Sequence, residues 1–246
     1  YTIDYEDLER KAADTKVKVM LLCNPHNPAG RVWRREELVR IGEICIRHDV
    51  TVVSDEIHCE LVFPGHHYTP FASISEDFLH HSVTCISPSK AFNIAGLQIA
   101  NIVCADANRR EKIDQAINAN EVCDVNPFGV IATQAAYNEG EEWLNQLIEY
   151  LHVNYLYMQE FCREHLPEFP VAILEGTYLV WMDCRKLGIS SEELERRLVT
   201  EARLWLNAGT MYGAEGKGFM RWNIACPRNT LTEGLKRFAD FVYSAK

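Results

Sequence analysis

The sequence has no closely spaced cysteine pair, although it contains nine cysteines among its 246 residues. The cysteines are scattered singly along the chain, no CxxC pair occurs, and their number is odd. This pattern argues against both a disulfide framework and a zinc site. We therefore expect free, mostly buried thiols in the reducing cytoplasm, and no bound metal.

Long apolar runs and an excess of positive charge are also absent. No stretch is long enough to cross a bilayer, and we recognise no signal peptide. The formal net charge is −10, and no stripe of lysine and arginine offsets it, so we expect neither a nucleic acid nor a membrane partner. What the chain does have is 47% hydrophobic and 10% aromatic residues, enough to bury one large core or two modest ones.

Four apolar runs in the first half of the chain are typical of buried strands. Turn-rich loops and a helical pattern over residues 34–49 separate them. The runs cover residues 17–23, 50–54, 82–86 and 97–104. This alternation predicts an α/β fold with a mainly parallel sheet covered by helices.

The second half mixes helices and short strands, which indicates a smaller α+β domain. A long helical pattern covers residues 141–165, and capping boxes at Ser190 and Thr230 predict two more helices. The strands are expected at residues 171–174, 178–182 and 219–224. We accordingly expect a partial large domain over residues 1–143 and a small domain over residues 144–246.

Three unusual stretches, residues 24–30, 54–58 and 87–90, each follow a predicted strand. In a parallel sheet, ligands bind beyond the carboxyl ends of the strands. A lysine in a partly desolvated pocket can attack an aldehyde and form a Schiff base, and a strand-end carboxylate can hold a pyridinium nitrogen protonated. Taken singly, Lys90 could be a surface lysine, Asp55 a turn or cap residue, and Asn27 a turn residue.

The motifs NPHNPAGRVW, SDEIHCEL and SPSKAFNIAGLQ together resemble the fold-type I pyridoxal-phosphate enzymes of the class I/II aminotransferase family. The resemblance implies pyridoxal 5′-phosphate as cofactor and a partial transferase-like large domain. By the same match, Lys90 corresponds to the lysine that binds the cofactor covalently, Asp55 to the partner of the pyridinium nitrogen and Asn27 to the donor to the ring oxygen. Ser87 corresponds to a phosphate ligand, and Ser89 is a lesser candidate.

The segment GFMRWNIACPR resembles the part of these enzymes whose arginine binds the substrate α-carboxylate, which makes Arg221 the matching residue. Without the resemblance, Arg221 reads as a strand-surface arginine. Two positions depart from many aminotransferases: His58 stands where a tyrosine beside the cofactor is common, and Gln98 where an arginine often binds the phosphate. His58 is therefore a candidate cofactor contact, although it could be a packed strand-end histidine.

The string SDEIH, followed closely by Leu61, resembles the cystathionine β-lyase-type C–S lyases. This subgroup acts in amino-acid metabolism and eliminates a thiol from cystathionine or a cysteine conjugate, which leaves pyruvate and ammonia. Two other functions stay open: an aminotransferase that passes the amino group to a 2-oxo acid, and a non-catalytic cofactor-fold domain of a transcription regulator.

The family has a substantial segment before the point that matches the start of this chain. That segment supplies sheet strands, a phosphate-binding helix N-terminus and an aromatic residue that stacks on the cofactor ring. The resemblance therefore implies that the chain is a fragment, inactive alone, with an exposed apolar sheet edge or face. It also implies that the full-length protein is a homodimer that acts on a small amino-acid substrate.

Overall fold

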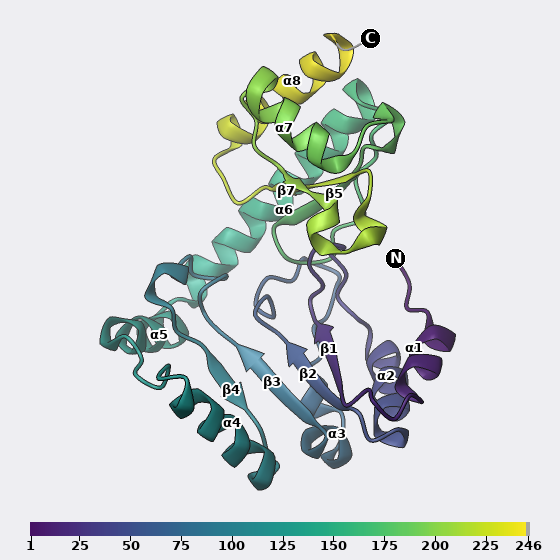
Figure 1. Ribbon diagram of the computed structural model, residues 1–246. Helices are drawn as coiled ribbons and strands as arrows, with labels where there is room; N and C mark the ends of the chain where they lie inside the picture. Colours follow the sequence, from purple (N-terminus) through teal and green to yellow (C-terminus); the bar gives the residue numbers. More distant parts are fainter. Residues whose placement is uncertain (245–246) are drawn as a thin grey trace. The chain divides into compact units, whose positions relative to one another are not determined.

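The computed structural model describes residues 1–244 and divides the chain into two compact units (Figure 1). Unit 1 comprises residues 1–26 and 32–146. Unit 2 comprises residues 27–31 together with the chain from Leu147 onward. Unit 2 is therefore discontinuous in sequence, because a five-residue segment that follows the first strand belongs to it.

Unit 1 is an α/β unit built on a four-stranded sheet of order β1-β2-β3-β4. Strands β1, β2 and β3 are parallel, and β4 is antiparallel to β3. This confirms the predicted α/β fold with a mainly parallel sheet. Its elements are α1 (Tyr5–Ala12), β1 (Val19–Cys23), α2 (Arg35–Arg47), β2 (Thr51–Asp55), a 3₁₀ turn (Phe71–Ser73), α3 (Glu76–His80), β3 (Ser82–Ile86), a 3₁₀ turn (Ala95–Leu97), β4 (Asn101–Val103), α4 (Ala107–Ala119) and α5 (Pro127–Glu139).

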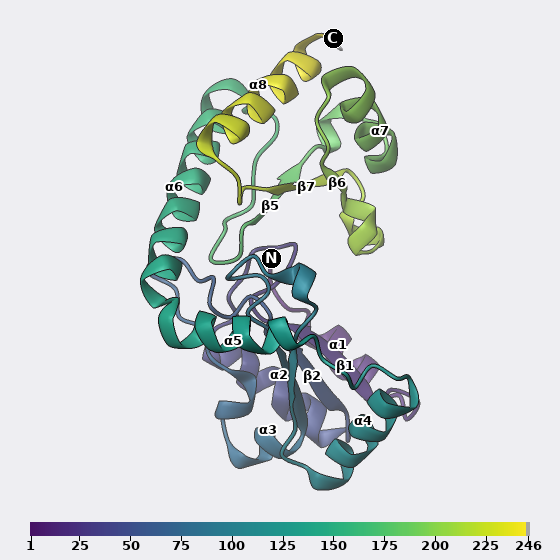
Figure 2. The same cartoon turned by 90° about the vertical axis from the view of Figure 1, so that its left-hand side faces the viewer.

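Helices α2 and α3 cover one face of this sheet, and Figure 2 shows them on one side of the strands with α4 on the other. Leu22 and Val52 point from the strands into the core, where they meet Leu38 and Ile41 of α2 and Phe78 of α3. All five are buried. Because side chains alternate along a strand, the residues next to Leu22 and Val52 point to the opposite face.

The opposite face of the sheet carries exposed apolar side chains. Val19 is 52% exposed, Leu21 is 80% exposed, and Ile102 on β4, the register partner of Cys85, is 48% exposed. Among the described residues, α4 contributes none to the core, and α5 buries only Gly129. Leu21 in particular leaves most of its side chain open to solvent, and exposed apolar surface of this kind favours association.

Unit 2 is an α+β unit built on a three-stranded antiparallel sheet of order β5-β7-β6. Leu151 and Met158 of α6 lie in its core with Phe238 of α8, and all three are fully buried. The boundary between the units falls inside α6, before Leu147. The elements are α6 (Glu141–His165), β5 (Leu179–Asp183), a 3₁₀ turn (Arg185–Leu187), α7 (Ser191–Ala202), β6 (Asn207–Ala208), two 3₁₀ turns (Gly209–Tyr212 and Ala214–Gly216), β7 (Phe219–Asn223) and α8 (Arg228–Ser244).

Helices α6 and α7 begin where the sequence predicts. The Ser190 hydroxyl accepts a hydrogen bond from the Glu193 backbone N–H at 3.2 Å, so the predicted N-cap of α7 is confirmed. The predicted cap at Thr230 is wrong. Helix α8 begins at Arg228, directly after Pro227, so Thr230 already lies in its first turn.

The strand predicted over residues 171–174 is also wrong. Only an isolated bridge between Val171 and Met182 forms there. The Tyr155 hydroxyl donates to the Ala172 carbonyl at 3.2 Å and accepts from the Leu174 N–H at 3.0 Å. A side chain therefore satisfies backbone groups for which a strand would need a neighbour.

Within the described part of the chain, no helix is long and apolar enough to cross a membrane. The same residues contain no group of three or more histidine, cysteine or acidic side chains that could hold a metal ion. All nine cysteines are free thiols, and four of them are buried: Cys45, Cys104, Cys162 and Cys184.

Candidate active site

Asp55 is the last residue of β2, with a cysteine beside it on each neighbouring strand. The register pairs Cys23 of β1 with Asp55, and Asp55 with Cys85 of β3. Register partners point to the same face of a sheet. Cys23 follows Leu21 by two residues, so this row lies on the face opposite the α2 core, at the carboxyl end of the parallel strands.

The Asp55 carboxylate is exposed, and its Oδ1 accepts one hydrogen bond, from the Ile57 backbone N–H at 3.2 Å. The thiol of Cys85 is half-buried beside it. Burial raises the pKa of Cys85, and the negative charges of Asp55 and Glu56 raise it further. The end of β2 is thus a region of negative potential, which suits a cationic ring nitrogen rather than an anion.

Lys90 follows β3 after a three-residue connection and is half-buried. The backbone around it is fixed by two hydrogen bonds: the Phe92 N–H donates to the Pro88 carbonyl at 2.9 Å, and the Ile94 N–H donates to the Ser89 carbonyl at 3.1 Å. Asp55 and Lys90 therefore follow neighbouring parallel strands, at the edge where such sheets bind ligands.

The two serines before Lys90 are both buried, but they are bonded differently. The Ser87 hydroxyl donates to the Ile99 carbonyl at 2.6 Å and accepts from the Ser89 N–H at 3.1 Å. To donate to a phosphate, Ser87 would have to give up the Ile99 carbonyl. Ser89 uses its backbone N–H in this arrangement, so its hydroxyl can serve as a donor without breaking that bond.

His58 lies in the turn after β2 and is only 3% exposed. Its backbone carbonyl accepts a hydrogen bond from the Leu61 N–H at 2.9 Å. Burial of this kind suits a packed histidine as well as a cofactor contact, so the role of His58 stays a prediction.

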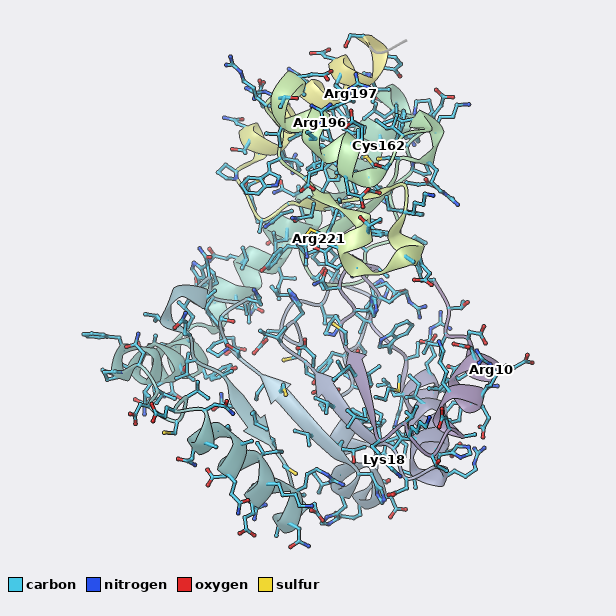
Figure 3. The ribbon with its side chains drawn as sticks, in the orientation of Figure 1. Arg10, Lys18, Cys162, Arg196, Arg197 and Arg221 are labelled. Carbon is cyan, nitrogen blue, oxygen red and sulfur yellow. The ribbon has the colours of Figure 1, made fainter. Side chains whose placement is uncertain are left out.

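The remaining predicted site residues, Asn27 and Arg221, lie together in unit 2. Arg221 is on β7, as Figure 3 shows. Its Nη1 donates to Asn27 Oδ1 at 3.1 Å, and its Nη2 donates to Asn207 Oδ1 at 2.8 Å. The guanidinium carbon lies 4.8 Å from the centre of the Tyr212 ring.

This arrangement holds the Arg221 guanidinium in one plane. Each terminal nitrogen donates one N–H hydrogen bond to an amide oxygen, and the Tyr212 ring covers one face of the guanidinium by a cation–π contact. No acidic partner neutralises the charge within these contacts, so the remaining N–H groups of the fork can receive a carboxylate in bidentate form. The same bond leaves the Asn27 Nδ2 as the free donor of its amide, because Oδ1 is committed to Arg221.

Sequence reasoning passed over three residues that the structure adds to these two sets. Glu56 is 1% exposed and accepts three hydrogen bonds directly behind Asp55. Asn207 and Tyr212 hold Arg221 from positions 14 and 9 residues before it in the chain. A charged residue next to a strand-end aspartate was a usable signal for Glu56, whereas nothing in the spacing of Asn207 or Tyr212 marks them.

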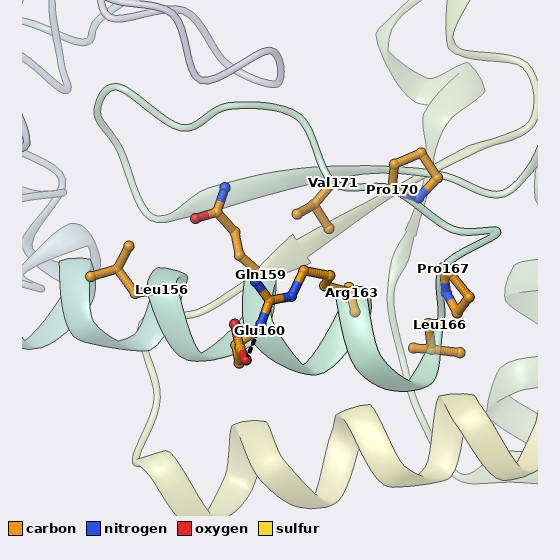
Figure 4. A pocket seen from close by; sticks show the side chains of 9 residues that line it. Leu156, Gln159, Glu160, Arg163, Leu166, Pro167, Pro170 and Val171 are labelled. Carbon is orange, nitrogen blue, oxygen red and sulfur yellow. Dashed lines mark hydrogen bonds and ion pairs between the residues drawn. The ribbon is translucent and has the colours of Figure 1, made fainter.

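A groove of about 640 Å³ opens on unit 2, between the second half of α6 and the segment after it (Figure 4). None of the predicted site residues lines it. The lining residues are Leu156, Gln159, Glu160, Cys162, Arg163, Leu166, Pro167, Pro170 and Val171. Its charged members, Arg163 and Glu160, pair with each other, so the groove presents no unpaired charge from this pair to a ligand.

The α/β fold with a mainly parallel sheet is that of a transferase-like protein, and residues 1–238 match the aminotransferase class I and II family. The chain belongs to this family. It is 46% identical to cystathionine β-lyase PatB of Bacillus subtilis (strain 168) over 237 residues, which cover 96% of the chain and 61% of PatB.

Solved structures show the same relationship. The crystal structure of cystalysin from Treponema denticola, which contains pyridoxal 5′-phosphate, superposes with a TM-score of 0.97 at 34% identity and covers all of this chain. The pyridoxal-phosphate-bound C–S lyase from Staphylococcus hominis has a TM-score of 0.88 at 35% identity and covers 97% of it. The chain spans 62% of each of these two proteins and 61% of PatB.

Proposed function

We propose that the full-length protein is a pyridoxal-phosphate-dependent C–S β-lyase that acts on cystathionine or another L-cysteine derivative. The observation that carries the proposal is the placement of Asp55 and Lys90 after neighbouring parallel strands, on a sheet whose register is continuous up to Asp55. The names of similar proteins, PatB and the two lyases of known structure, support β-elimination over amino transfer.

The donor set fits the cofactor. The Lys90 amine is half-buried at the strand end and can bind an aldehyde carbon. The exposed Asp55 carboxylate can hold a ring nitrogen protonated, and the Asn27 Nδ2 can donate to a ring oxygen. Of the two serines, Ser89 is better placed than Ser87 to donate to the phosphate, because the Ser87 hydroxyl is bonded to the Ile99 carbonyl.

When bound, pyridoxal phosphate supplies an electron sink for the bond that breaks at the substrate α-carbon. Arg221 binds the substrate carboxylate with its remaining N–H groups and so fixes the α-carbon. The Lys90 amine, released when the amino group of the substrate takes its place on the aldehyde carbon, would then take the α-proton. The carbon–sulfur bond at the β-carbon would break with the electron pair leaving on sulfur. Addition of one water in all gives the thiol, pyruvate and ammonia.

The reaction itself tests the proposal. Purified full-length protein is supplied with pyridoxal phosphate and cystathionine, and pyruvate, ammonia and free thiol are measured. We expect the three products in equal amounts. An aminotransferase, which the family name keeps as the second candidate, would instead convert an added 2-oxo acid to an amino acid without forming pyruvate, and this result would contradict the lyase.

The lysine is tested separately from the reaction. Borohydride reduction of the loaded protein followed by peptide mapping should place the cofactor on Lys90. Lys18, which lies on the exposed segment before β1, is the matched control and should stay unmodified. A label on any lysine other than Lys90 would refute the assignment.

We also infer that the full-length protein is a cytoplasmic homodimer that functions in amino-acid metabolism. The free cysteines support a reducing compartment, and the exposed apolar side chains on β1 and β4 support association. Light scattering of the full-length protein tests the dimer: a mass equal to one chain at micromolar concentration would exclude it.

A further inference from the structure

Glu56 is a buried carboxylate placed directly behind Asp55. It is 1% exposed, and because it follows Asp55 by one residue its side chain points to the opposite face of the sheet. Its Oε1 accepts from the Ser54 hydroxyl at 2.7 Å and from the Phe71 backbone N–H at 3.0 Å. Its Oε2 accepts from the Tyr68 hydroxyl. We call these four groups the Glu56 clamp.

Filling a core position with the Glu56 carboxylate carries a desolvation cost. Moving a carboxylate out of water costs several kcal/mol unless hydrogen bonds replace its hydration. The three donors of the clamp are a hydroxyl, a phenol and an amide, all of them neutral. Burial raises the pKa of Tyr68, and the charge of Glu56 adds to this, so the phenol keeps its proton as donor. An apolar side chain could fill the same space without these partners, so the position calls for an explanation beyond packing.

The clamp joins the end of β2 to the loop over residues 68–71, and a second side chain holds the same loop. Asn24, which is fully buried at the end of β1, donates from Nδ2 to the Thr69 carbonyl at 3.1 Å. The backbone ladder continues on both sides of Asp55: the Asn24 N–H donates to the Asp55 carbonyl at 2.9 Å, and the Glu56 N–H donates to the Cys85 carbonyl at 2.9 Å. The peptide that carries Asp55 is thus held from three directions.

The Asp55 side chain itself has little of this support. Its carboxylate is exposed and accepts a single long bond, from the Ile57 N–H at 3.2 Å. The direction of the carboxylate is therefore set mainly by the backbone from which it extends. A group that fixes that backbone fixes the carboxylate.

We propose that Glu56 is a positioning residue for Asp55: through the Glu56 clamp it fixes the backbone at the end of β2 and so aims the Asp55 carboxylate at the ring nitrogen of the cofactor. The inference rests on the proposed function for the identity of that ring. Glu56 acts from behind the sheet and touches neither cofactor nor substrate.

The first readout needs no cofactor. In the full-length protein without pyridoxal phosphate, Glu56→Ala should raise amide hydrogen exchange in peptides that cover residues 54–58 and 68–71. Ile44→Ala is the matched control, because it removes a buried side chain of the same unit at a site in α2. It should lower the unfolding temperature without the local increase. Equal exchange in the two variants would overturn the inference.

The second readout uses the loaded protein at a temperature well below both unfolding transitions. Glu56→Ala should shift the absorption band of the bound cofactor and lower kcat by about 10- to 100-fold, the size expected when a reacting group is misplaced, with KM changed less than about 2-fold. Glu56→Gln can still accept at Oε1 and should recover most of both. Altered exchange with an unchanged band and kcat would show that the clamp is only structural and would overturn the inference. Wild-type protein that binds no pyridoxal phosphate would instead refute the proposed function, and the exchange result would then show only whether the clamp holds the backbone.

Discussion

The described contacts of Arg221 are all with neutral side chains, so its positive charge is available to a substrate carboxylate. The guanidinium is bonded to two amide oxygens and covered by the Tyr212 ring. In the full-length protein, Arg221→Ala should raise KM for the amino-acid substrate by about 10- to 150-fold, the equivalent of a charge-assisted hydrogen bond worth about 1.5–3 kcal/mol. Cofactor affinity should change far less.

Arg196 on the exposed side of α7 provides the matched control, because its partner Glu193 lies on the same helix. Arg196→Ala should leave KM unchanged. Steady-state kinetics and a cofactor titration measure both quantities. An unaltered KM for Arg221→Ala would place the substrate carboxylate elsewhere.

Replacing Asp55 has a different expected effect from replacing Arg221. Asp55→Ala in the full-length protein should keep the cofactor attached to Lys90 and lower kcat by about 100-fold or more, the range seen when one oriented electrostatic partner is lost from an active site. Asp49→Ala is the control, since Asp49 is an exposed turn residue before β2. Near-wild-type turnover by Asp55→Ala would remove this carboxylate from the mechanism.

The raised pKa values of the buried cysteines predict the order in which the thiols react with an alkylating reagent. The thiolate is the reactive form, and burial raises the pKa of Cys45 to about 11 and that of Cys162 to about 12. Alkylation of the folded chain at pH 8 should therefore modify exposed Cys123 first and these two thiols last. Mass spectrometry of the peptides measures the order. In urea the difference should vanish, and rapid native labelling of Cys45 would contradict the buried assignment.

At the scale of single elements, the sequence predicts best where one local pattern decides the outcome. Strand β3 and helix α6 form over the expected residues, because a continuous apolar run and a long amphipathic stripe have few alternative structures. The segment over residues 171–174 fails for a reason that no local pattern contains: the Tyr155 hydroxyl, 17 and 19 residues away from its two partners, replaces a strand neighbour.

The residues of the candidate site also differ in how far the sequence predicts them. Lys90, Asp55 and Asn27 stand in motifs that can be recognised in the chain, although their roles stay predictions. The contact between Arg221 and Asn27 joins side chains that are 194 residues apart in the sequence. Such contacts follow from tertiary packing, not from spacing.

The N-cap of α7 provides the element-scale prediction. The Ser190 hydroxyl satisfies the Glu193 N–H, one of the free donors at the helix start. Ser190→Ala should lower the free energy of unfolding of unit 2 by about 1 kcal/mol, within the usual 0.5–2 kcal/mol for a lost cap. Urea unfolding followed by circular dichroism measures the change.

Two further variants sharpen this test. Ser190→Asp should keep most of the stability, because aspartate also caps. Thr200→Ala removes a hydroxyl from a solvent-exposed position within the same helix, where it donates to the Arg196 carbonyl. This change should be neutral or slightly stabilising. A loss for Ser190→Ala no larger than that for Thr200→Ala would mean that the cap is not what stabilises α7.

The whole molecule presents an apolar sheet face to solvent, centred on Leu21. Because such surface favours association, the 246-residue chain alone should self-associate and should not turn over substrate. Leu21→Lys should shift light-scattering mass toward a single chain. Ile173→Lys is the control: Ile173 is 71% exposed and belongs to unit 2, and changing it should leave the mass unaltered. A monomeric unmodified chain would contradict the prediction.

The five residues that unit 2 takes from near the start of the chain have a consequence for synthesis. Arg31 pairs with Glu175 at 3.0 Å, and the Gly30 carbonyl accepts from the Glu175 N–H at 2.8 Å, so the segment closes against residues 144 positions later. During translation, residues 27–31 emerge from the ribosome long before their partners exist. Unit 1 can build its strands as it emerges, but unit 2 has to wait for the last third of the chain, and a ribosome stalled before Glu175 would expose this segment to chaperones and proteases.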